Sequence, residues 1–329
     1  MYYSCGDNKF SAADSIRDFE SNLTTLILNI LPSITAPIAH AGRQSFVAAF
    51  SSYFSPGSSS LEKASALVQG QCAIYRRYNI SVDDIARFEL GQGLALLANT
   101  VPAAFWVLFY IFSDEKLLVD VRAETSALIQ SSENAEGQLE RKVMLGNIKV
   151  KCPLLVSVFR EALRVQISMP QTRLILEDTI LNEKYLLKKG NVVQMPPQAV
   201  HFDAAILGKD VNEFNPRRFM KVGTEPSRDE RTMNTGSIKV PAAAFRSFGG
   251  GVNYCPGRHF AMTEVLSFIT LFVLRFDMKP AAGKWGLPRS DFHDIAASIA
   301  SPQEDVVVDV SIRPGCDKGT WKASMAENL

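Results

Sequence analysis

The spacing of apolar and polar residues along the chain predicts a mostly helical protein. From Ala12 to about Ser51 the pattern is helical, with breaks at Pro32 and Pro37, because proline in a helix interior removes a hydrogen bond and kinks or ends the helix. Ser81 is a predicted N-cap for the next long helix, whose first turn is acidic and so suits the helix dipole. The other predicted helices cover residues 61–78, 82–112, 114–130, 153–165 and 257–276.

Alternation of apolar and polar residues predicts a small β-sheet. Residues 172–187 and 191–196 alternate in this way and include β-branched side chains. They flank Lys188-Lys-Gly190, which predicts strands around a turn. Residues 305–312 predict one later strand. The expected fold class is therefore mainly α with a small β-sheet.

Two stretches between these elements lack a regular pattern. Residues 131–146 are polar and are predicted to form a loop. Residues 201–240 contain proline and glycine and are predicted to be irregular. A structureless stretch of that length inside a compact domain is usually functional or disordered, so it needs an explanation.

Residues 90–112 carry no formal charge and are long enough to cross a membrane. However, Gln92, Asn99 and Thr100 are polar and Pro102 lies near the middle, and unsatisfied polar groups are costly in lipid. The pattern therefore favours a long buried core helix over a transmembrane span.

A second apolar run lies at residues 23–31, between charged ends. It can touch a membrane surface or cover a pocket, and the sequence leaves both interpretations open. The first nine residues are polar and lack the basic-then-apolar pattern of a secretory signal, so no transmembrane anchor is expected there.

Composition narrows the function classes. With 35 Lys and Arg against 34 Asp and Glu, the formal charge is +1, so no overall field attracts nucleic acid, and nucleic acid is not an expected partner. The five cysteines are scattered and lack zinc-ligand spacing, which argues against a disulfide framework and favours a reducing compartment. The length fits one large domain or two medium ones.

The most informative segment is the glycine-rich loop at residues 245–258, which presents Cys255 just before a predicted helix. The amides and dipole of a helix N-terminus favour a charged sulfur, and glycines let the backbone approach a flat ligand closely. A large planar cofactor suits such a loop. The alternative is a buried free cysteine beside a glycine turn, which is the commoner fate of a lone cysteine.

The pattern Phe248-x-x-Gly251-x-x-x-Cys255-x-Gly257 resembles the haem loop of the cytochromes P-450 at every fixed position. The resemblance implies that Cys255 is the axial thiolate ligand of a haem iron, a ligation typical of this family. Phe248, Gly251 and Gly257 are then cofactor-binding residues, and residues 82–112, 153–165 and 257–276 correspond to the family's distal, K and L helices.

Three further residues match the family's later motifs. Glu161-Ala-Leu-Arg164 resembles the Glu-x-x-Arg of the K helix, and Phe214-Asn-Pro-Arg-Arg-Phe219 resembles the segment that supplies a second arginine, Arg218. The resemblance implies that Glu161, Arg164 and Arg218 form one buried charged network. The alternative for Glu161 and Arg164 is an exposed i, i+3 pair of small energetic value.

Arg173 lies about where the family places an arginine on a haem propionate, and a guanidinium fork suits a carboxylate. Without the haem loop, the sequence would predict that Arg173 is an ordinary surface arginine. Asn253 stands where many members carry Arg or His for the other propionate, so that contact is expected to be weaker or made elsewhere.

Residues 96–106 resemble the distal helix, with Asn99-Thr100 where most members have an acid followed by threonine. The pattern is closest to sterol 7α-hydroxylases, prostacyclin synthase and related fungal enzymes. Asn99 and Thr100 are the implied catalytic pair, although asparagine cannot titrate. Hydroxylation and a non-redox isomerisation both fit, and the alternative is that the two residues satisfy each other in a core helix.

The implied function is a haem-dependent monooxygenase that receives NADPH electrons from a separate reductase. Apolar residues of the distal helix fit either a lipophilic substrate or core packing: Leu94, Leu97, Ala98, Val101 and Phe105. The family places its full-length members on the cytoplasmic face of the endoplasmic reticulum, and this chain alone fits a cytoplasmic location with optional membrane contact.

Residues 1–329 are expected to form a single, partial cytochrome P-450 domain without the N-terminal part of the fold. Few residues precede the distal helix, so the family's first strands and helices do not fit before it. Weak haem binding is therefore expected, and an inactive remnant that acts only as an interaction protein is the alternative function.

Overall fold

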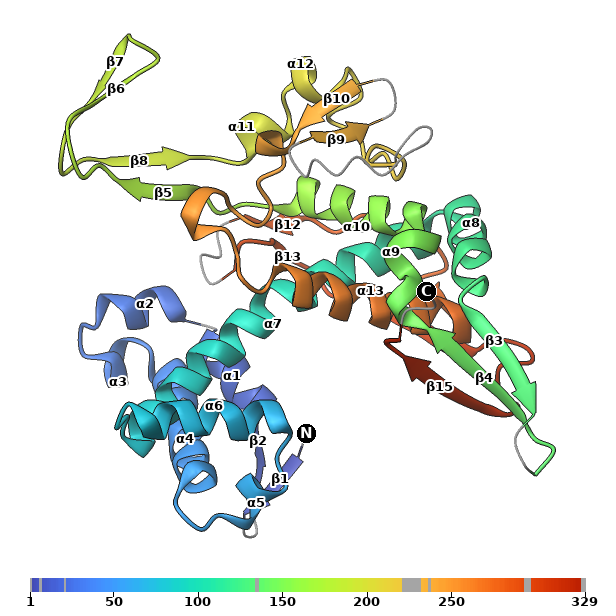
Figure 1. The fold of residues 1–329 in the computed structure, drawn as a ribbon, viewed down its shortest axis with the longest axis horizontal. Coiled ribbons are helices and arrows are strands. Elements are labelled where there is room, and N and C mark those ends of the chain that lie inside the picture. Colours follow the sequence, from blue (N-terminus) through green and yellow to red (C-terminus); the bar gives the residue numbers. More distant parts are fainter. Residues whose placement is uncertain are drawn as a thin grey trace. The chain divides into compact units, whose positions relative to one another are not determined.

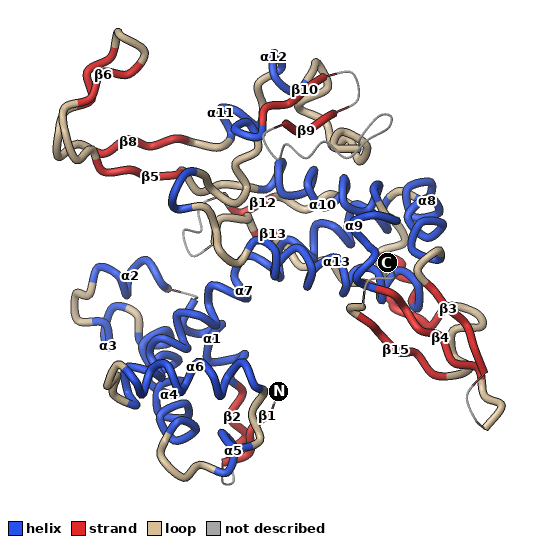
Figure 2. The backbone as a smooth tube through the Cα atoms, in the orientation of Figure 1, coloured by secondary structure: helices blue, strands red, loops and turns tan. Residues whose placement is uncertain are grey.

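A computed structural model describes residues 2–5, 8–20, 22–133, 136–220, 232–235, 238–292 and 297–326 (Figures 1 and 2). The chain forms two compact units, Met1–Asn99 and Thr100–Leu329. The fold is mostly helical with small sheets, as predicted.

The first unit is a group of helices preceded by a hairpin of β1 and β2. Pro32 and Pro37 each stand in the first turn of a helix, which confirms the two predicted breaks. Phe46, Ile16 and Leu90 form one apolar cluster of this unit. The elements are β1 (Tyr2–Cys5), β2 (Asn8–Ser11), α1 (Ala12–Glu20), α2 (Leu23–Leu28), α3 (Pro32–Thr35), α4 (Pro37–Phe54), α5 (Ser59–Glu62) and α6 (Ala66–Arg77).

The long helix α7 (Val82–Ser113) runs through the division between the units. Ser81 caps it as predicted, because the Asp84 amide donates to the Ser81 hydroxyl at 3.1 Å. By length and composition α7 is also able to cross a membrane. Its C-terminal part is a core helix of the second unit, where Trp106 is fully buried and its indole N–H donates to the Ala300 carbonyl at 2.7 Å.

The core of the second unit joins the end of α7 to three other helices. These are α8 (Glu115–Ser126), α10 (Pro153–Gln166) and α13 (Arg258–Arg275), and the short α9 (Ile148–Lys151) precedes α10. Figure 1 shows α10 and α13 running alongside each other beneath the strands β9 and β10, and contacts join the two helices. The buried side chains include Val107, Ile111, Leu155, Val158, Phe159, Leu266, Ile269 and Val273.

The predicted polar loop at residues 131–146 is wrong. Residues 129–133 and 139–144 form β3 (Ile129–Glu133) and β4 (Leu139–Met144), which pair antiparallel, and β15 (Thr320–Ser324) adds a parallel strand to β4. Backbone hydrogen bonds make a strand even where the side chains are polar. The pairing with β15 joins segments far apart in sequence, which no local pattern reveals.

The predicted strand at 172–187 is interrupted, so two hairpins replace one. β5 (Gln171–Leu174) pairs with β8 (Val192–Met195), and β6 (Thr179–Leu181) pairs with β7 (Tyr185–Leu187) inside that loop. The predicted turn near Gly190 is present, with φ +83° there. The late strand is confirmed as β14 (Val308–Ile312), which pairs with β11 (Phe276–Pro280), and β12 (Ser290–Asp291) pairs with β13 (Ser301–Pro302).

The predicted irregular stretch at 201–240 contains short elements. These are α11 (Gln198–His201), α12 (Ala204–Leu207), and the paired strands β9 (Thr232–Thr235) and β10 (Ile238–Pro241). Residues 221–231, 236 and 237 lie outside the described residues. The described residues also form short 3₁₀ turns at η1 (Leu145–Asn147), η2 (Ala242–Ala244) and η3 (Gly251–Asn253).

Candidate functional site

The loop that carries Cys255 closes on itself through backbone hydrogen bonds. The Cys255 amide donates to the Phe248 carbonyl at 2.9 Å, and the Gly249 amide donates to the Arg246 carbonyl at 3.0 Å. Gly249 and Gly251 have φ of +82° and +67°, a region that a side chain makes costly. The sequence therefore folds into a tight loop because glycine stands at both left-handed positions.

Cys255 is a half-buried free cysteine, three residues before α13 begins. Arg258, the first residue of α13, ties the loop to the helix, since its guanidinium donates to the Cys255 carbonyl at 3.0 Å. The same guanidinium lies 4.4 Å from the centre of the Tyr254 ring. A Cβ added at Gly257 would meet the Cys255 sulfur at 3.9 Å, an ordinary van der Waals distance, so the sulfur lies close to this glycine.

The other described thiols have different environments. Burial raises the pKa of the Cys152 thiol to about 12, and Glu124 adds to the rise. Cys72 is also buried, and Cys316 donates its S–H to the Leu274 carbonyl at 3.4 Å. Cys255 is thus the half-buried thiol that a glycine-rich loop presents at a helix N-terminus.

Strand β5 contacts the Cys255 loop through two side chains. Arg173 donates to the Gly250 carbonyl at 2.8 Å, and Gln171 donates to the Arg246 carbonyl at 3.1 Å. Arg173 is therefore bound to the loop backbone, which differs from a surface arginine. Phe248 packs against the main apolar core and fixes the start of the loop.

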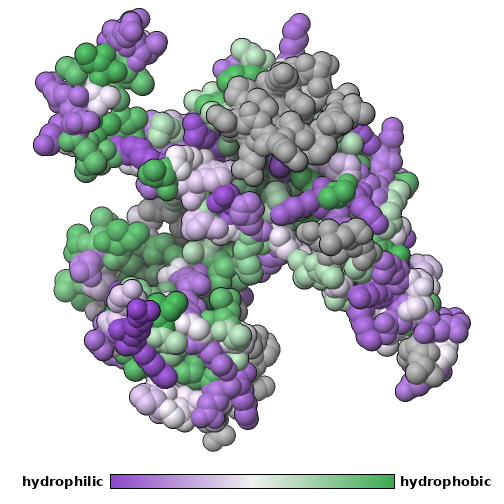
Figure 3. Space-filling view, in the orientation of Figure 1, coloured by the Kyte–Doolittle hydropathy of each residue, from purple (hydrophilic) through white to green (hydrophobic). Residues whose placement is uncertain are grey.

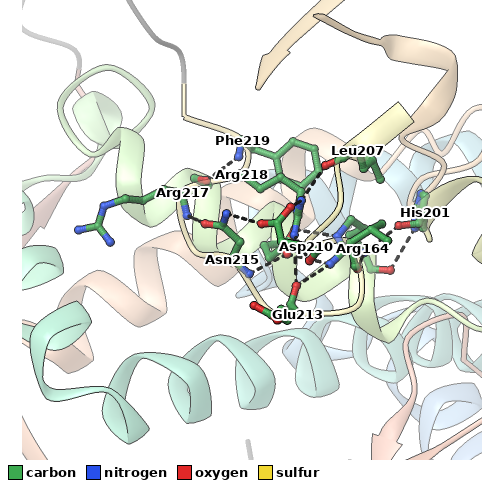
Figure 4. Close-up of polar contacts among 12 residues, drawn as sticks. Arg164, His201, Leu207, Asp210, Glu213, Asn215, Arg217, Arg218 and Phe219 are labelled. Carbon is green, nitrogen blue, oxygen red and sulfur yellow. Dashed lines mark hydrogen bonds and ion pairs between the residues drawn. The ribbon is translucent and has the colours of Figure 1, made fainter. Parts of the chain in front are cut away.

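A buried charged network joins α10 to the segment that follows β8 (Figure 4). Arg164 donates from Nε and Nη2 to the two oxygens of Glu161, both at 2.8 Å. Arg218 donates from Nε to the same oxygens at 3.1 and 3.2 Å. Glu161 and Arg164 are fully buried, so the alternative of an exposed i, i+3 pair does not describe them.

The remaining donors of the two arginines bind backbone carbonyls of the segment that follows β8. Asp210 also accepts from Arg218 at 2.8 Å, so two carboxylates balance two guanidiniums. The hydrogen bond from Arg218, followed by that from Asn215, lowers the pKa of Asp210. Burial alone would lower the pKa of Arg218, but Asp210 and Glu161 outweigh it and raise that pKa. The backbone carbonyls that accept hydrogen bonds from Arg164 or Arg218 belong to His201, Leu207, Asp210, Val211 and Glu213.

His201 joins α10 to the Cys255 loop, a role that the sequence did not predict. Its Nδ1 lies 3.1 Å from the Arg164 carbonyl, and its Nε2 accepts from the Arg246 amide at 2.8 Å. These contacts place the proton on Nδ1 of a neutral ring. Burial lowers the pKa of His201 to about 4, and the charges of Arg164 and Arg246 add to the effect. Its only signal in the sequence is the scarcity of histidine, four in the chain.

The structure places the remaining predicted residues as follows. Asn99 and Thr100 are neighbours on α7, half-buried and buried, and the division between the two units falls between them. Asn253 ends the η3 turn of the Cys255 loop. The second unit thus gathers Cys255, Arg173, Glu161, Arg164 and Arg218 around α10 and the loop, while Asn99 and Thr100 lie on α7.

Comparison with known proteins agrees with the motifs. Residues 86–303 match the family model described as Cytochrome P450. The chain is 34% identical over 94% of its length to the cytochrome P450 monooxygenase nodJ of Hypoxylon pulicicidum, and 27% identical over 95% to a cytochrome P450 monooxygenase of Gibberella zeae. The chain spans 59% of the length of each of these relatives.

A more distant similarity agrees with the predicted likeness to sterol hydroxylases. The chain is 27% identical to the cholesterol 7-alpha-monooxygenase of Cricetulus griseus, over 67% of this chain and 44% of that protein. Both the fungal and the sterol-hydroxylase likenesses were expected from the Asn99-Thr100 segment.

Proposed function

Because this chain belongs to the cytochrome P450 family, we propose that it is the haem-binding part of a monooxygenase that oxidises a lipophilic small molecule. Cys255 is the proposed axial ligand of the haem iron. The observation that carries the proposal is the loop from Phe248 to Cys255, closed by the 2.9 Å hydrogen bond between these residues and free of side-chain bulk at Gly249 and Gly251.

The residues present fit a haem. Cys255 stands three residues before α13, and the positive end of a helix dipole suits a negatively charged ligand of iron. Glycines at the left-handed positions leave backbone rather than side chains on the loop surface, as a flat ligand requires. Bound haem would supply the activation of dioxygen, for which the thiolate donates electron density.

The other residues hold this ligand in place or orient the reactants. Glu161, Arg164 and Arg218 hold the segment after β8 against α10. His201 accepts a hydrogen bond from the Arg246 amide, so this segment is also fixed to the start of the Cys255 loop. Arg173 fixes Gly250 and is the proposed donor to a propionate. Asn99 and Thr100 are the proposed residues that hold water and guide protons on the distal side.

The proposed electron source is NADPH through a separate reductase, as the family relationship implies. The proposed lipophilic substrate class is supported by the relatives, which include a monooxygenase named for cholesterol. A second candidate is a non-redox isomerase, which is favoured by Asn99 standing where most members carry an acid. Only the monooxygenase requires NADPH and adds an oxygen atom to the product.

The test is a hemin titration of the chain, followed by the carbon monoxide difference spectrum of the reduced protein. The red-shifted band typical of thiolate ligation is expected, and Cys255→Ala should abolish it. Cys316→Ala is the matched control, because Cys316 is also free and half-buried but lies outside the loop. If excess hemin gives no sulfur-to-iron bond in the parent chain, the proposed function is wrong.

A further inference from the structure

A small cavity lies in the second unit, where η1 and α9 meet the middle of α13 and the segment that follows β15 (Figure 1). Its volume is about 110 Å³, and a cavity of that size holds several water molecules or one small organic molecule. Met325 lines it and is exposed, so the cavity opens to solvent on that side. The buried wall is aliphatic and consists of Leu145, Ile148 and Leu266.

The backbone around this cavity is held by a close crossing of two segments. Strand β15 runs parallel to β4, and β4 ends at Met144, directly before η1. A Cβ on Gly146 would lie 2.5 Å from the Met325 carbonyl oxygen and 2.9 Å from that of Ala326, so glycine is what lets the segments approach this closely. Figure 3 shows the sheet of β3, β4 and β15 as mostly hydrophilic, whereas the buried wall of the cavity is aliphatic. The cavity is therefore a defined part of the fold, with a character different from that of the neighbouring sheet.

Unpaired polar groups are concentrated in η1 and α13, two of the elements that line this cavity. Asn147 Nδ2, Ser267 Oγ and Thr270 Oγ1 are buried and have no hydrogen-bond partner among the described residues. Ser267 lines the cavity, Asn147 stands between two lining residues, and Thr270 follows Ser267 by three positions on the same side of α13. Buried polar groups normally form hydrogen bonds, so this region offers hydrogen bonds that a bound molecule can make.

The polar groups of the lining favour a negatively charged ligand. Lys149 brings an ammonium group at the exposed edge, and Thr263 and Ser267 bring hydroxyls. The described residues that line the cavity include no carboxylate. An ammonium group only donates hydrogen bonds and a hydroxyl can donate one, so the matching ligand presents oxygen acceptors.

From this we propose that the cavity binds a short aliphatic monocarboxylate. The carboxylate accepts hydrogen bonds from Lys149 and Ser267, and the alkyl chain lies against the buried aliphatic wall. A multiply charged anion fits less well, because one cation balances one negative charge and an aliphatic wall gives the rest no partner. This inference is independent of the proposed function, because it uses no residue of the Cys255 loop.

The test is a titration of the full chain with sodium butyrate, followed by saturation-transfer difference NMR. A saturable signal is expected, with a dissociation constant on the order of 1 mM, because so small a ligand has few atoms that contribute binding energy. 1-Butanol and butylammonium are the matched probes, since they keep the alkyl chain but carry a neutral or a positive group in place of the carboxylate. Both should bind about tenfold more weakly or not at all.

Three substitutions connect the signal to the cavity. Ser267→Leu fills the cavity and should abolish binding, with circular dichroism as the check on its fold. Ser267→Ala keeps the space but removes the hydroxyl, so the dissociation constant should rise by about tenfold. Lys149→Gln should raise it by about fivefold through the lost charge. Lys151→Gln is the matched control and should leave it unchanged, because Lys151 is exposed on the same helix but does not line the cavity.

Other outcomes would overturn the inference. The absence of a saturable butyrate signal would show that the cavity takes no such ligand, and equal binding of 1-butanol would exclude the carboxylate as the recognised group. Undiminished binding by a folded Ser267→Leu variant would place the ligand elsewhere. Equal losses in Lys149→Gln and Lys151→Gln would indicate general attraction by surface charge. The titration requires no haem, so its failure would leave the proposed function unaffected.

Discussion

Two regions of this molecule reverse the ordinary distribution of side chains, and they do so in opposite ways. Around Glu161 charged groups are fully buried, whereas on α2 and α3 isoleucines and leucines are exposed. The buried charges have their partners inside the chain, because Arg164 and Arg218 both bind Glu161. The second region has its inner face covered and its outer face exposed, and its exposed residues are here called the aliphatic patch: Ile27, Leu28, Ile30, Leu31, Ile34 and Ile38. The contrast indicates a structural role for the first region and an interaction role for the second.

The largest effect should come from breaking the buried network. Glu161→Gln keeps the shape of the side chain but leaves two guanidiniums with one carboxylate, so the free energy of unfolding should fall by about 3–5 kcal/mol. Urea unfolding followed by circular dichroism measures it. Asp178→Asn is the control, because the Asp178–Lys188 pair is exposed and its loss should lower the free energy of unfolding far less than Glu161→Gln does. Equal small losses in both variants would contradict the structural role of the network.

A smaller, pH-dependent effect is expected at His201. Its pKa is about 4 in the folded chain, against an ordinary 6.5, so the unfolded chain takes up a proton first as the pH falls. The stability from neutral His201 is therefore complete above pH 6.5 and is lost between pH 6.5 and about 4. The difference in pKa corresponds to about 3 kcal/mol.

The measurement compares the parent chain with His201→Gln across that pH window. Glutamine has an amide that can accept from the Arg246 N–H but does not titrate, so its stability should fall less steeply with falling pH. Other titrating groups are common to both proteins and cancel in the difference. Parallel pH profiles for the two chains would show that His201 is not held neutral by the fold.

The local parts of these regions were predictable, and the distant contacts were not. Glu161 and Arg164 are three residues apart on one helix, so their spacing predicted a pair, and the glycines before Cys255 predicted a tight loop. The bonds of His201 to Arg164 and Arg246 join residues far apart in the chain, and no pattern around His201 indicates them. The pairing of β15 with β4 was missed for the same reason.

For the segment that carries the aliphatic patch, the sequence predicted an apolar helix but left two interpretations of it open. The apolar run at residues 23–31 indicated a helix, but a membrane contact and a pocket cover require the same composition. Exposure distinguishes the two faces, since Leu26 is buried while Ile27 and Leu28 are exposed. A linear sequence cannot assign these faces in so short a helix, because fewer than two turns give no clear periodicity.

The smallest effect on stability should come from the patch itself. Ile34→Ser removes an exposed side chain and should change the free energy of unfolding by about 0.5 kcal/mol or less, since surface positions seldom matter more. Leu26→Ser, on the inner face of the same segment, should cost about 2 kcal/mol or more, because it leaves a cavity and buries a hydroxyl. Urea unfolding without lipid measures both. If Ile34→Ser cost as much as Leu26→Ser, the outer face would already be covered within the chain, and the contrast with the buried network would disappear.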